Sequence, residues 1–453
     1  MAKKKMTFEE KLEEAIVKDA PYEVPDNWIW SNVGSISLEI KNGTTIKQNK
    51  DEIGIKVTRI ESLQNNGIDL NRLGTIIETE KIKEQDYYID GDIALSHINS
   101  LEHVGKTALI DNSLLPLVHG MNLLRIRVNK RMILPKYFQL YTRGYDYKKF
   151  VVDRVNRAVN QVSLNQKNLS DVPMPIPPLK EQQRIVDKIE SLFEKLDKAK
   201  ELIEEVRDDF EKRKSAILEK AFRGELTKVW RKENNINREW KREKLKDITK
   251  ITSGGTPSRK HPEYFEGKIP WIKTGEILWN KIYDSEEHIT EEAIANSSAK
   301  LIPEGAVLVA MYGQGLTRGR ASILEKEACT NQAVCALIPS DAVLNSYLYY
   351  YFMSNYWRFR QVAKGGNQEN LSGKVIGAFE IDIPSIEEQN EIVRILDKLL
   401  EEESKIEELT TLEEQIELIK KSILAKAFRG QLGTNCEDDE SALELLKEIL
   451  SKE

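Results

Sequence analysis

The residues that most often carry enzyme chemistry are few in this chain and are not spaced as a catalytic site. Five histidines could act as zinc ligands, and they are His97, His103, His119, His261 and His288. None has a cysteine or second histidine at the spacing that a zinc site requires. The three cysteines are Cys329, Cys335 and Cys436, and their spacing predicts free thiols in a reducing compartment.

The glycine-rich stretch from Gly313 to Gly319 follows a predicted strand but does not have the sequence of a nucleotide-binding loop. It lacks the Gly-Lys-Ser/Thr ending of a phosphate-binding loop and the spacing of a dinucleotide site. The Asp/Asn-Pro-Pro-aromatic tetrapeptide of amino-methyltransferases does not occur in the sequence. We therefore predict that the chain catalyses no reaction and itself binds no metal or cofactor.

The elements that must position any binding residues occur twice. Residues 215–226 read SAILEKAFRGEL, and residues 422–432 read SILAKAFRGQL. Each stretch ends a long helical segment that opens after a proline with Glu-Gln. Trp28 lies 212 positions before Trp240, and Gly105 lies 214 before Gly319. Matching positions along the whole length indicate a tandem duplication in which each half is one globular region and one long helix.

The globular regions read as mixed α/β. Strand-like runs lie between turn residues at 55–60, 92–96, 123–128, 306–311 and 333–338. A helix is predicted from Pro135 and another over 347–359, while the proline-rich stretches 172–178 and 379–384 are predicted to be stiff extended lead-ins. The predicted fold is a duplicated α/β (mixed α+β) globular domain alternating with two long helices in an antiparallel coiled coil, with pseudo-two-fold symmetry.

The long helices carry apolar residues at alternating spacings of three and four, which predicts a coiled-coil seam. The predicted seam residues are Ile185, Ile189, Leu192, Leu196, Ile203, Val206, Phe210, Ile392, Leu399, Ile406, Ile416 and Ile423. Pro178 is expected in the first turn of the first helix and Ser385 in a capping box with Glu388. Gly224 and Gly430 are expected to end the two helices.

The predicted organisation has six parts. Thr7 opens a capping box for an N-terminal helix that Pro21 is expected to stop, and a short amphipathic helix is predicted near the C-terminus. The parts are an N-terminal helix (1–20), a first globular domain (21–177), a first helical spacer (178–227), a second globular domain (228–383), a second helical spacer (384–433), and an acidic linker with a C-terminal helix (434–453).

Charge and hydropathy constrain the partners. The net charge is −6, but the globular regions are nearly neutral and the acidic excess lies in the helices and tails. Such acidic helices suit contacts with protein rather than with phosphate. No apolar run approaches the roughly 18 residues that a membrane span needs, so we expect a cytoplasmic protein without a membrane partner.

This architecture resembles the DNA-specificity subunit of type I restriction-modification enzymes over essentially the whole chain. The local signatures are SGGTP at 253–257, PWI at 270–272, GNQENLS at 366–372, Ile383-Pro384 before Glu388-Gln389, and the two Phe-Arg-Gly ends. The first half departs from this pattern, since 41–45 lacks the proline and 160–164 lacks the leading glycine. The resemblance implies a non-catalytic subunit that binds a split, asymmetric duplex DNA sequence.

The resemblance further implies two modification subunits docked on the helices, with restriction subunits in the full complex. S-adenosylmethionine, ATP and Mg would belong to those partners. Amides and guanidinium groups can bond base edges, while hydroxyls and lysines fix register on phosphate. The candidates in the first region are Thr44, Lys47, Ser96, Asn99, Lys106, Asn156, Arg157, Asn160 and Gln161. Those in the second are Thr256, Ser258, Arg259, Lys260, Tyr312, Gln314, Thr317, Arg318, Arg320, Lys364, Asn367 and Gln368.

An alternative from another class of protein is a coiled-coil adaptor whose two α/β regions bind protein and not DNA. It accounts for the helices and their acidity. It does not account for paired loops rich in amides and basic residues.

Overall fold

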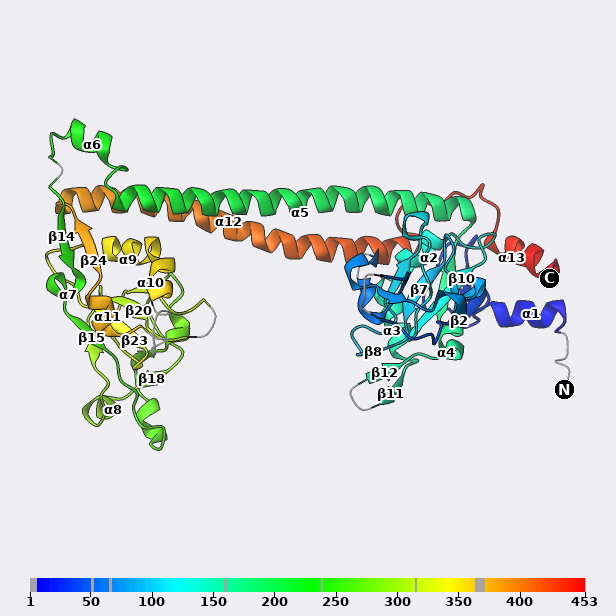
Figure 1. Ribbon diagram of the computed structural model, residues 1–453, viewed down its shortest axis with the longest axis horizontal. Helices are drawn as coiled ribbons and strands as arrows, with labels where there is room; N and C mark the ends of the chain where they lie inside the picture. Colours follow the sequence, from blue (N-terminus) through cyan, green and yellow to red (C-terminus); the bar gives the residue numbers. More distant parts are fainter. Residues whose placement is uncertain are drawn as a thin grey trace. The chain divides into compact units, whose positions relative to one another are not determined.

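The computed structural model (Figure 1) describes residues 6–49, 53–64, 67–158, 161–237, 239–313, 316–362 and 371–452. The side chains of residues 158, 362, 400 and 402–410 also lie outside this description. The chain divides into two compact units. Unit 1 contains residues 1–202 and 411–453, and unit 2 contains residues 203–410.

Two long helices, α5 (Leu179–Phe222) and α12 (Ile386–Ala427), each contribute one part to either unit. In unit 1, Ile185 near the start of α5 shares a core with Phe428, just past the end of α12. In unit 2, Ile392 near the start of α12 shares a core with Leu218 near the end of α5. The helices therefore pair antiparallel within each unit, as the sequence predicts.

Most of the predicted seam is buried. The fully buried members are Ile185, Ile189, Phe210, Ile392, Leu399 and Ile416, and the half-buried ones are Leu192, Leu196, Ile203 and Ile423. Ile406 lies outside the described side chains. The assignment of Val206 is wrong, because 48% of this residue is exposed. In this part of α5 the face toward the core passes through Ile203 and Phe210, which lie seven residues apart, and Val206 lies outside it.

The starts of the long helices differ from the predictions. The amide of Gln182 donates to the carbonyl of Pro178 at 2.9 Å, so Pro178 precedes the helix as its cap and does not lie in the first turn. Ser385 accepts from the amide of Glu388 at 3.3 Å, as a capping box requires. The carboxylate of Glu388 turns inward instead and accepts from Trp240 Nε1 at 3.0 Å. Only one half of that box has formed.

The predicted ends are confirmed. Gly224 and Gly430 have φ of +70° and +69°, a conformation that glycine adopts without strain. The residue after each glycine donates its amide to the carbonyl five positions earlier, at 2.9 Å in the first helix and 2.8 Å in the second. Both helices thus end in the same glycine-based cap.

In unit 1 the globular region contains a four-stranded antiparallel sheet in the order β2-β10-β7-β9, against which α2 and α3 pack. The strands of the whole globular region are β1 (Ile29–Asn32), β2 (Ser37–Asn42), β3 (Ile55–Val57), β4 (Leu63–Gln64), β5 (Gly67–Ile68), β6 (Gly74–Ile76), β7 (Ile93–Ser96), β8 (Ile98–Asn99), β9 (Thr107–Leu109), β10 (Leu123–Val128), β11 (Asn156–Ala158), β12 (Gln161–Ser163) and β13 (Pro173–Ile176). Its shorter helices are α1 (Phe8–Ala15), α2 (Pro135–Tyr141), α3 (Tyr145–Val152), α4 (Gln166–Ser170) and α13 (Ala442–Ser451).

In unit 2 the main sheet has the order β15-β23-β20-β21-β17, and α9 contacts β20 and β21. Its strands are β14 (Lys241–Lys244), β15 (Ile251–Ser253), β16 (Ile269–Ile272), β17 (Lys281–Ile282), β18 (His288–Ile289), β19 (Leu301–Ile302), β20 (Val307–Ala310), β21 (Ala321–Leu324), β22 (Ala328–Thr330), β23 (Val334–Leu337) and β24 (Glu380–Ile383). Its shorter helices are α6 (Lys228–Glu233), α7 (Leu245–Ile248), α8 (Glu291–Ala295), α9 (Asn345–Ser354), α10 (Tyr356–Val362) and α11 (Gly373–Gly377).

The two main sheets share one frame, because β2, β10, β7 and β9 correspond to β15, β23, β20 and β21. The same turn joins equivalent strands in both units. The amide of Gly105 donates to the carbonyl of Ser96 at 2.8 Å, and the amide of Gly319 donates to that of Ala310 at 2.8 Å. The φ angles of these two glycines are +80° and +88°. The duplication therefore extends to individual turns.

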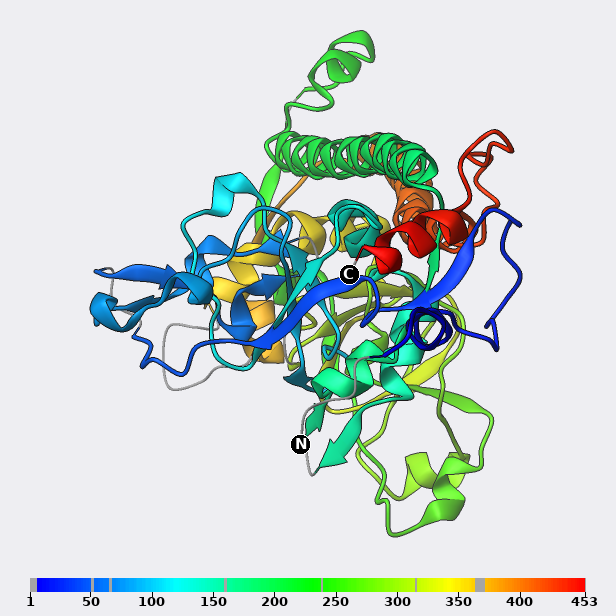
Figure 2. The same cartoon turned by 90° about the vertical axis from the view of Figure 1, so that its right-hand side faces the viewer.

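One element prediction is refined and two need correction. The extended lead-ins are paired strands, since β13 pairs with β1 and β24 with β14. The helix predicted over 347–359 is broken at Asn355, which separates α9 from α10. The capping box at Thr7 is present, but α1 ends at Ala15, well before Pro21. α1 packs against the C-terminal helix α13 (Figure 2).

Candidate nucleic-acid interface

In unit 1, several predicted DNA-binding residues lie at one edge of the main sheet. β2 and β7 end at this edge, while β9 and β10 begin there. Thr44 and Lys47 follow β2, Ser96 and Asn99 lie at and beyond the end of β7, and Lys106 directly precedes β9. Residues from three loops are thus gathered by the antiparallel register.

A small three-stranded sheet extends this edge. It has the order β11-β12-β8, and Asn99 of β8 lies opposite Val162 of β12. The β11–β12 hairpin carries Asn156, Arg157 and Gln161, all of which are exposed. One hairpin therefore presents two amides and a guanidinium group to the solvent beside Asn99.

Not every predicted residue lies at the surface of this edge. Ser96 is only 1% exposed, and its hydroxyl accepts from Asn99 Nδ2 at 3.1 Å. Thr44 is half-buried, and its amide donates to the carbonyl of His119 at 2.9 Å. Ser96 orients Asn99, while Lys47 remains an exposed cation.

The equivalent edge of unit 2 has different side chains. β15 and β20 end there, followed by the exposed residues Thr256 and Tyr312, and β21 begins there after Arg318 and Arg320. The two arginines are half-buried. Arg320 Nε is buried and has no hydrogen-bond partner in the part of the chain that the structure describes. An acceptor brought by a ligand would satisfy this donor.

Three further candidates in unit 2 follow Thr256 on one loop, and a fourth lies on the turn before β21. Ser258 and Lys260 are exposed. Arg259 donates to Glu287 at 2.6 Å and stacks on Phe265 with 4.0 Å between the guanidinium carbon and the ring centre. Arg259 is exposed but already has these two partners, while Thr317 is half-buried in the turn. Asn160, Gln314, Lys364, Asn367 and Gln368 lie outside the described residues.

Sequence reasoning missed a cavity at the unit 1 edge. It has a volume of about 640 Å³, and its polar lining includes Asn42, His97, Ser163, Gln166 and Lys167. Burial lowers the pKa of the His97 ring, which keeps the imidazole neutral near pH 7. The segment between β12 and α4 lies against His97, since the amide of Leu164 donates to the carbonyl of His97 at 2.8 Å. The short spacing between β12 and α4 is the signal that sequence reasoning missed.

A second histidine supports this edge from inside. His119 is 1% exposed, and Nε2 lies 3.1 Å from the carbonyl of Leu123 at the start of β10. Burial and the nearby Arg125 lower its pKa to about 3. Arg125 in turn donates to Glu39 at 2.6 Å. The ring is therefore a neutral donor that holds the loop after β2 against β10.

Neither a metal site nor a membrane-spanning helix occurs within the described ranges. No group of three or more His, Cys, Asp or Glu side chains there could hold a metal ion. Likewise, none of the helices in these ranges combines the length and apolar character needed to cross a membrane.

Comparison with known proteins decides the family. The sequence matches the family described as "Type I restriction modification DNA specificity domain" twice, over residues 25–208 and 237–418. The chain belongs to this family. It is a DNA sequence-specificity subunit of a type I restriction-modification system, a kind of subunit that is itself non-catalytic and assembles with other subunits.

Curated specificity subunits resemble this one along most or half of the chain. The putative MjaX specificity subunit of Methanocaldococcus jannaschii is 29% identical over 443 residues, which cover 93% of this chain and 97% of that one. The EcoR124I/EcoR124II specificity subunit of Escherichia coli is 33% identical over 231 residues, 50% of this chain and 55% of its own.

Solved structures share the fold of this specificity subunit. A chain from a study of type I restriction-modification complex assembly superposes with a TM-score of 0.70 at 20% identity, covering 91% of this chain and all of that one. The HsdS subunit from Thermoanaerobacter tengcongensis gives a TM-score of 0.57 at 18% identity, covering 92% of this chain and all of that one. The α/β domains and long helices are thus the fold of this class.

Proposed function

We propose that each unit of this specificity subunit reads one half of a split, asymmetric sequence in duplex DNA. The observation that carries the proposal is the equivalence of the two sheet edges. The same strand ends gather candidate residues in both units. The residues themselves differ, because this edge carries Asn99 and Lys106 in unit 1 but Tyr312 and Arg320 in unit 2. A shared frame with unlike side chains suits two unlike half-sites.

The chemistry of the edge residues fits base and phosphate contacts. A guanidinium such as that of Arg157 can bond guanine O6 and N7, and an amide such as that of Gln161 can bond adenine N6 and N7. Lysines such as Lys47 and Lys106 suit phosphates, which set the register of the protein on the duplex. The neutral His97 in the nearby cavity can also donate to or accept from a base edge.

The long helices are assigned two roles in this proposal. They fix the gap between the half-sites, and they dock two modification subunits that carry S-adenosylmethionine and methylate adenine N6. Restriction subunits that use ATP and Mg would join the full complex. The excess of acidic over basic side chains on α12 supports a protein partner over phosphate.

The experiment compares two double variants in complexes reconstituted with modification subunits. Arg157→Ala/Gln161→Ala should weaken or relax one half-site, and Arg318→Ala/Arg320→Ala should do so at the other. Each lost bidentate base contact is expected to cost about 1–3 kcal/mol of discrimination. Mapping of methylated adenines measures both half-sites at once.

Arg242→Ala is a matched control, because Arg242 is exposed, pairs with Asp382 at 2.8 Å and lies away from the edge. Its methylation pattern should equal that of the wild type. Equal losses at both half-sites in either double variant would contradict the division between units. Failure of the wild-type complex to retain duplex DNA on a filter would instead favour the protein-binding adaptor.

A further inference from the structure

Two small sheets hold equivalent positions in the units but differ in what covers them. The β1–β13 sheet of unit 1 corresponds to the β14–β24 sheet of unit 2. Trp28 next to β1 donates to Glu181 at 2.7 Å, and Trp240 next to β14 donates to Glu388 at 3.0 Å. Seven of the eight residues in β1 and β13 are buried. All four residues of β14 are exposed, and β24 has a single buried residue.

Terminal segments of the chain cover the sheet in unit 1. Ala15 of α1, together with Leu446 and Ile449 of α13, is buried in the same core as β1 and β13. The outer edge of β1 is also paired, since the amide of Val17 donates to the carbonyl of Trp30 at 2.9 Å. Two amphipathic helices and an extended segment therefore complete this sheet.

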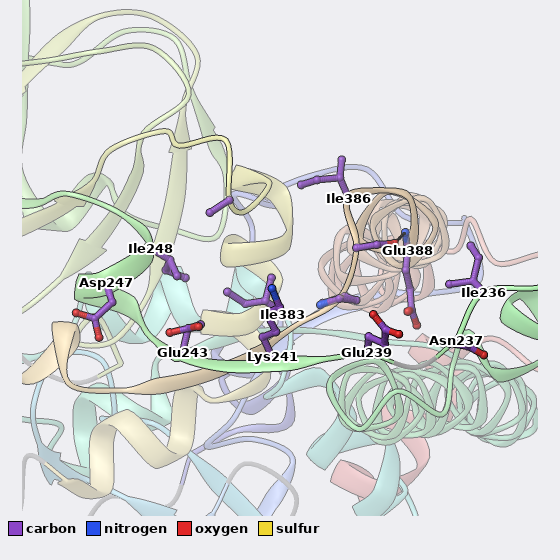
Figure 3. Close-up of a pocket in the computed structure, with 13 residues that line it drawn as sticks. Ile236, Asn237, Glu239, Lys241, Glu243, Asp247, Ile248, Ile383, Ile386 and Glu388 are labelled. Carbon is purple, nitrogen blue, oxygen red and sulfur yellow. Dashed lines mark hydrogen bonds between the residues drawn. The ribbon is translucent and has the colours of Figure 1, made fainter.

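Unit 2 has a groove at the equivalent place, with a volume of about 690 Å³ (Figure 3). Its apolar lining is Ile236, Ile248, Ile383, Pro384 and Ile386. Three exposed carboxylates, Glu239, Glu243 and Asp247, line it together with one lysine, Lys241. The groove thus has an apolar floor and a net negative rim.

The linker that enters the β14–β24 sheet does not cover the groove. Residues 223–240 join α5 to β14, whereas unit 1 uses both chain ends at this place. α6 lies on that linker, and its Val229 is 67% exposed. Ile236, Asn237 and Glu239 near the end of the linker line the groove.

We propose that this groove binds an amphipathic helix with a basic polar face, supplied by a modification subunit. The identity of the partner rests on the proposed function. An apolar floor of this size selects a helix with an apolar stripe, as α1 and α13 provide in unit 1. Three carboxylates on the rim select lysine or arginine on its flanks.

Charge excludes the helices of a second copy of the chain. α1 carries four glutamates and one lysine, and α13 carries two glutamates and one lysine. Either helix would bring like charge against Glu239, Glu243 and Asp247. Like charges opposed across an interface are unfavourable, so the occupant comes from a different subunit.

The first test measures affinity of the full-length subunit for purified modification subunit without DNA. Glu243→Lys/Asp247→Lys should weaken binding roughly tenfold or more, with a smaller loss at high salt because exposed charges are screened. Glu243→Gln/Asp247→Asn, which preserves side-chain shape, should give an intermediate loss. Glu292→Lys/Glu304→Lys is the control, since it makes the same charge change at exposed positions of unit 2 outside the groove. Unchanged affinity in both groove variants would overturn the proposal.

The second test identifies the occupant. A photo-crosslinking residue at Ile386, which is 39% exposed on the groove, should link to a lysine- or arginine-rich helix of the modification subunit. A link to a second copy of this chain, or to an acidic segment, would overturn it. Because neither measurement contains DNA, the groove proposal can fail while the half-site proposal stands. A wrong half-site assignment would conversely change the methylation pattern and leave this affinity unchanged.

Discussion

At the scale of single residues, the duplicated glutamates Glu181 and Glu388 show how one position serves two units differently. Both are buried, and both accept from a tryptophan indole and a threonine hydroxyl. Glu388 also forms an ion pair with the buried Arg231. Glu181 accepts from the neutral Asn435 at 3.0 Å instead. The partners differ because the linker supplies the cation in unit 2, whereas the C-terminal segment supplies the amide in unit 1.

Removal of the buried cation should destabilise unit 2. Arg231→Met leaves the carboxylate of Glu388 buried without its counter-charge, which typically costs about 3–5 kcal/mol. The added change Glu388→Gln should restore much of the loss, because it removes the isolated charge. Denaturant unfolding of the single and double variants tests this, and a double variant no more stable than the single would contradict it.

The free energy of unfolding of unit 1 should depend on pH in part through the titration of Glu181. Burial raises the pKa of this carboxyl above its usual 4.5, despite the hydrogen bonds from Trp28, Asn435 and Thr434. A raised folded-state pKa gives stability that is fully present below the unfolded-state value and is lost as pH rises through the folded-state value. The free energy of unfolding of the wild type minus that of Glu181→Gln should therefore fall as pH rises from about 4 to 7. A difference that rises with pH would contradict this prediction.

At the scale of elements, the ends of the long helices hold the globular regions through matched aromatic contacts. The Phe428 ring packs edge-on against Tyr137 and Tyr141, with ring centres 5.3 and 5.2 Å apart. Phe222 lies 5.0 Å from Tyr347 in unit 2. Phe428 is 3% exposed, whereas Phe222 is only half-buried. The same motif is therefore more deeply packed in unit 1.

Phe428→Ala should lower stability more than Phe222→Ala. Truncation of a fully buried phenylalanine commonly costs about 3–5 kcal/mol through lost burial and the cavity left behind. Phe222 already has part of its surface in water, so its truncation removes less. Hydrogen exchange of α2 and α9 would assign each loss to its unit, and equal protection losses in both variants would argue against the difference in packing.

Much of the architecture could be predicted because local signals and periodicity agree with it. Gly224 and Gly430 require a left-handed conformation, and Pro135 begins a helix, so these boundaries follow from short-range chemistry. The strand identity of 173–176 did not follow, because proline-rich sequence predicts extension but not its partner. β1, which pairs with that stretch, lies some 140 residues away. Pairing at that distance is decided by tertiary contacts.

The candidate interface was predictable in composition but not in geometry. Lys106 and Arg320 were found because the turns that carry them are repeated. Ser96 has the right chemistry for a base contact, but the register of β7 buries it. His97 was considered only as a metal ligand, so its place in a polar cavity was missed. Sequence reveals residue type and spacing, while exposure depends on which strands become neighbours.

At the scale of the whole molecule, each unit is completed by the tail of a helix that begins in the other half of the sequence. In unit 2, Thr227, just past α5, donates to Glu388 at 2.6 Å. In unit 1, Thr434, past α12, donates to Glu181 at 3.3 Å. Leu424 of α12 likewise matches Leu218 of α5, and each is 5% exposed in its own unit. The end of α5 therefore carries residues equivalent to those with which the end of α12 packs in unit 1.

This interchangeability predicts the behaviour of a fragment. Residues 1–227 lack the part of α12 that unit 1 needs but retain its counterpart at the end of α5. Two copies can therefore exchange these ends, with Leu218, Phe222 and Thr227 of one copy in the places of Leu424, Phe428 and Thr434. Such a self-complementary surface gives a symmetric dimer. With modification subunits, this dimer should methylate an inverted repeat of the first half-site.

Sedimentation and methylation mapping test the fragment together. Leu218→Asp is the matched variant, because it places a charge on the exchanged surface and leaves the globular region unchanged. It should convert the dimer to a monomer and abolish methylation of the inverted repeat, since isolated burial of a carboxylate is costly. A wild-type fragment that stays monomeric, or that dimerises yet still reads an asymmetric site, would contradict the exchange. The first outcome would mean that seam residues such as Phe210 fit only the unlike residues of α12, because seam composition selects the partner helix.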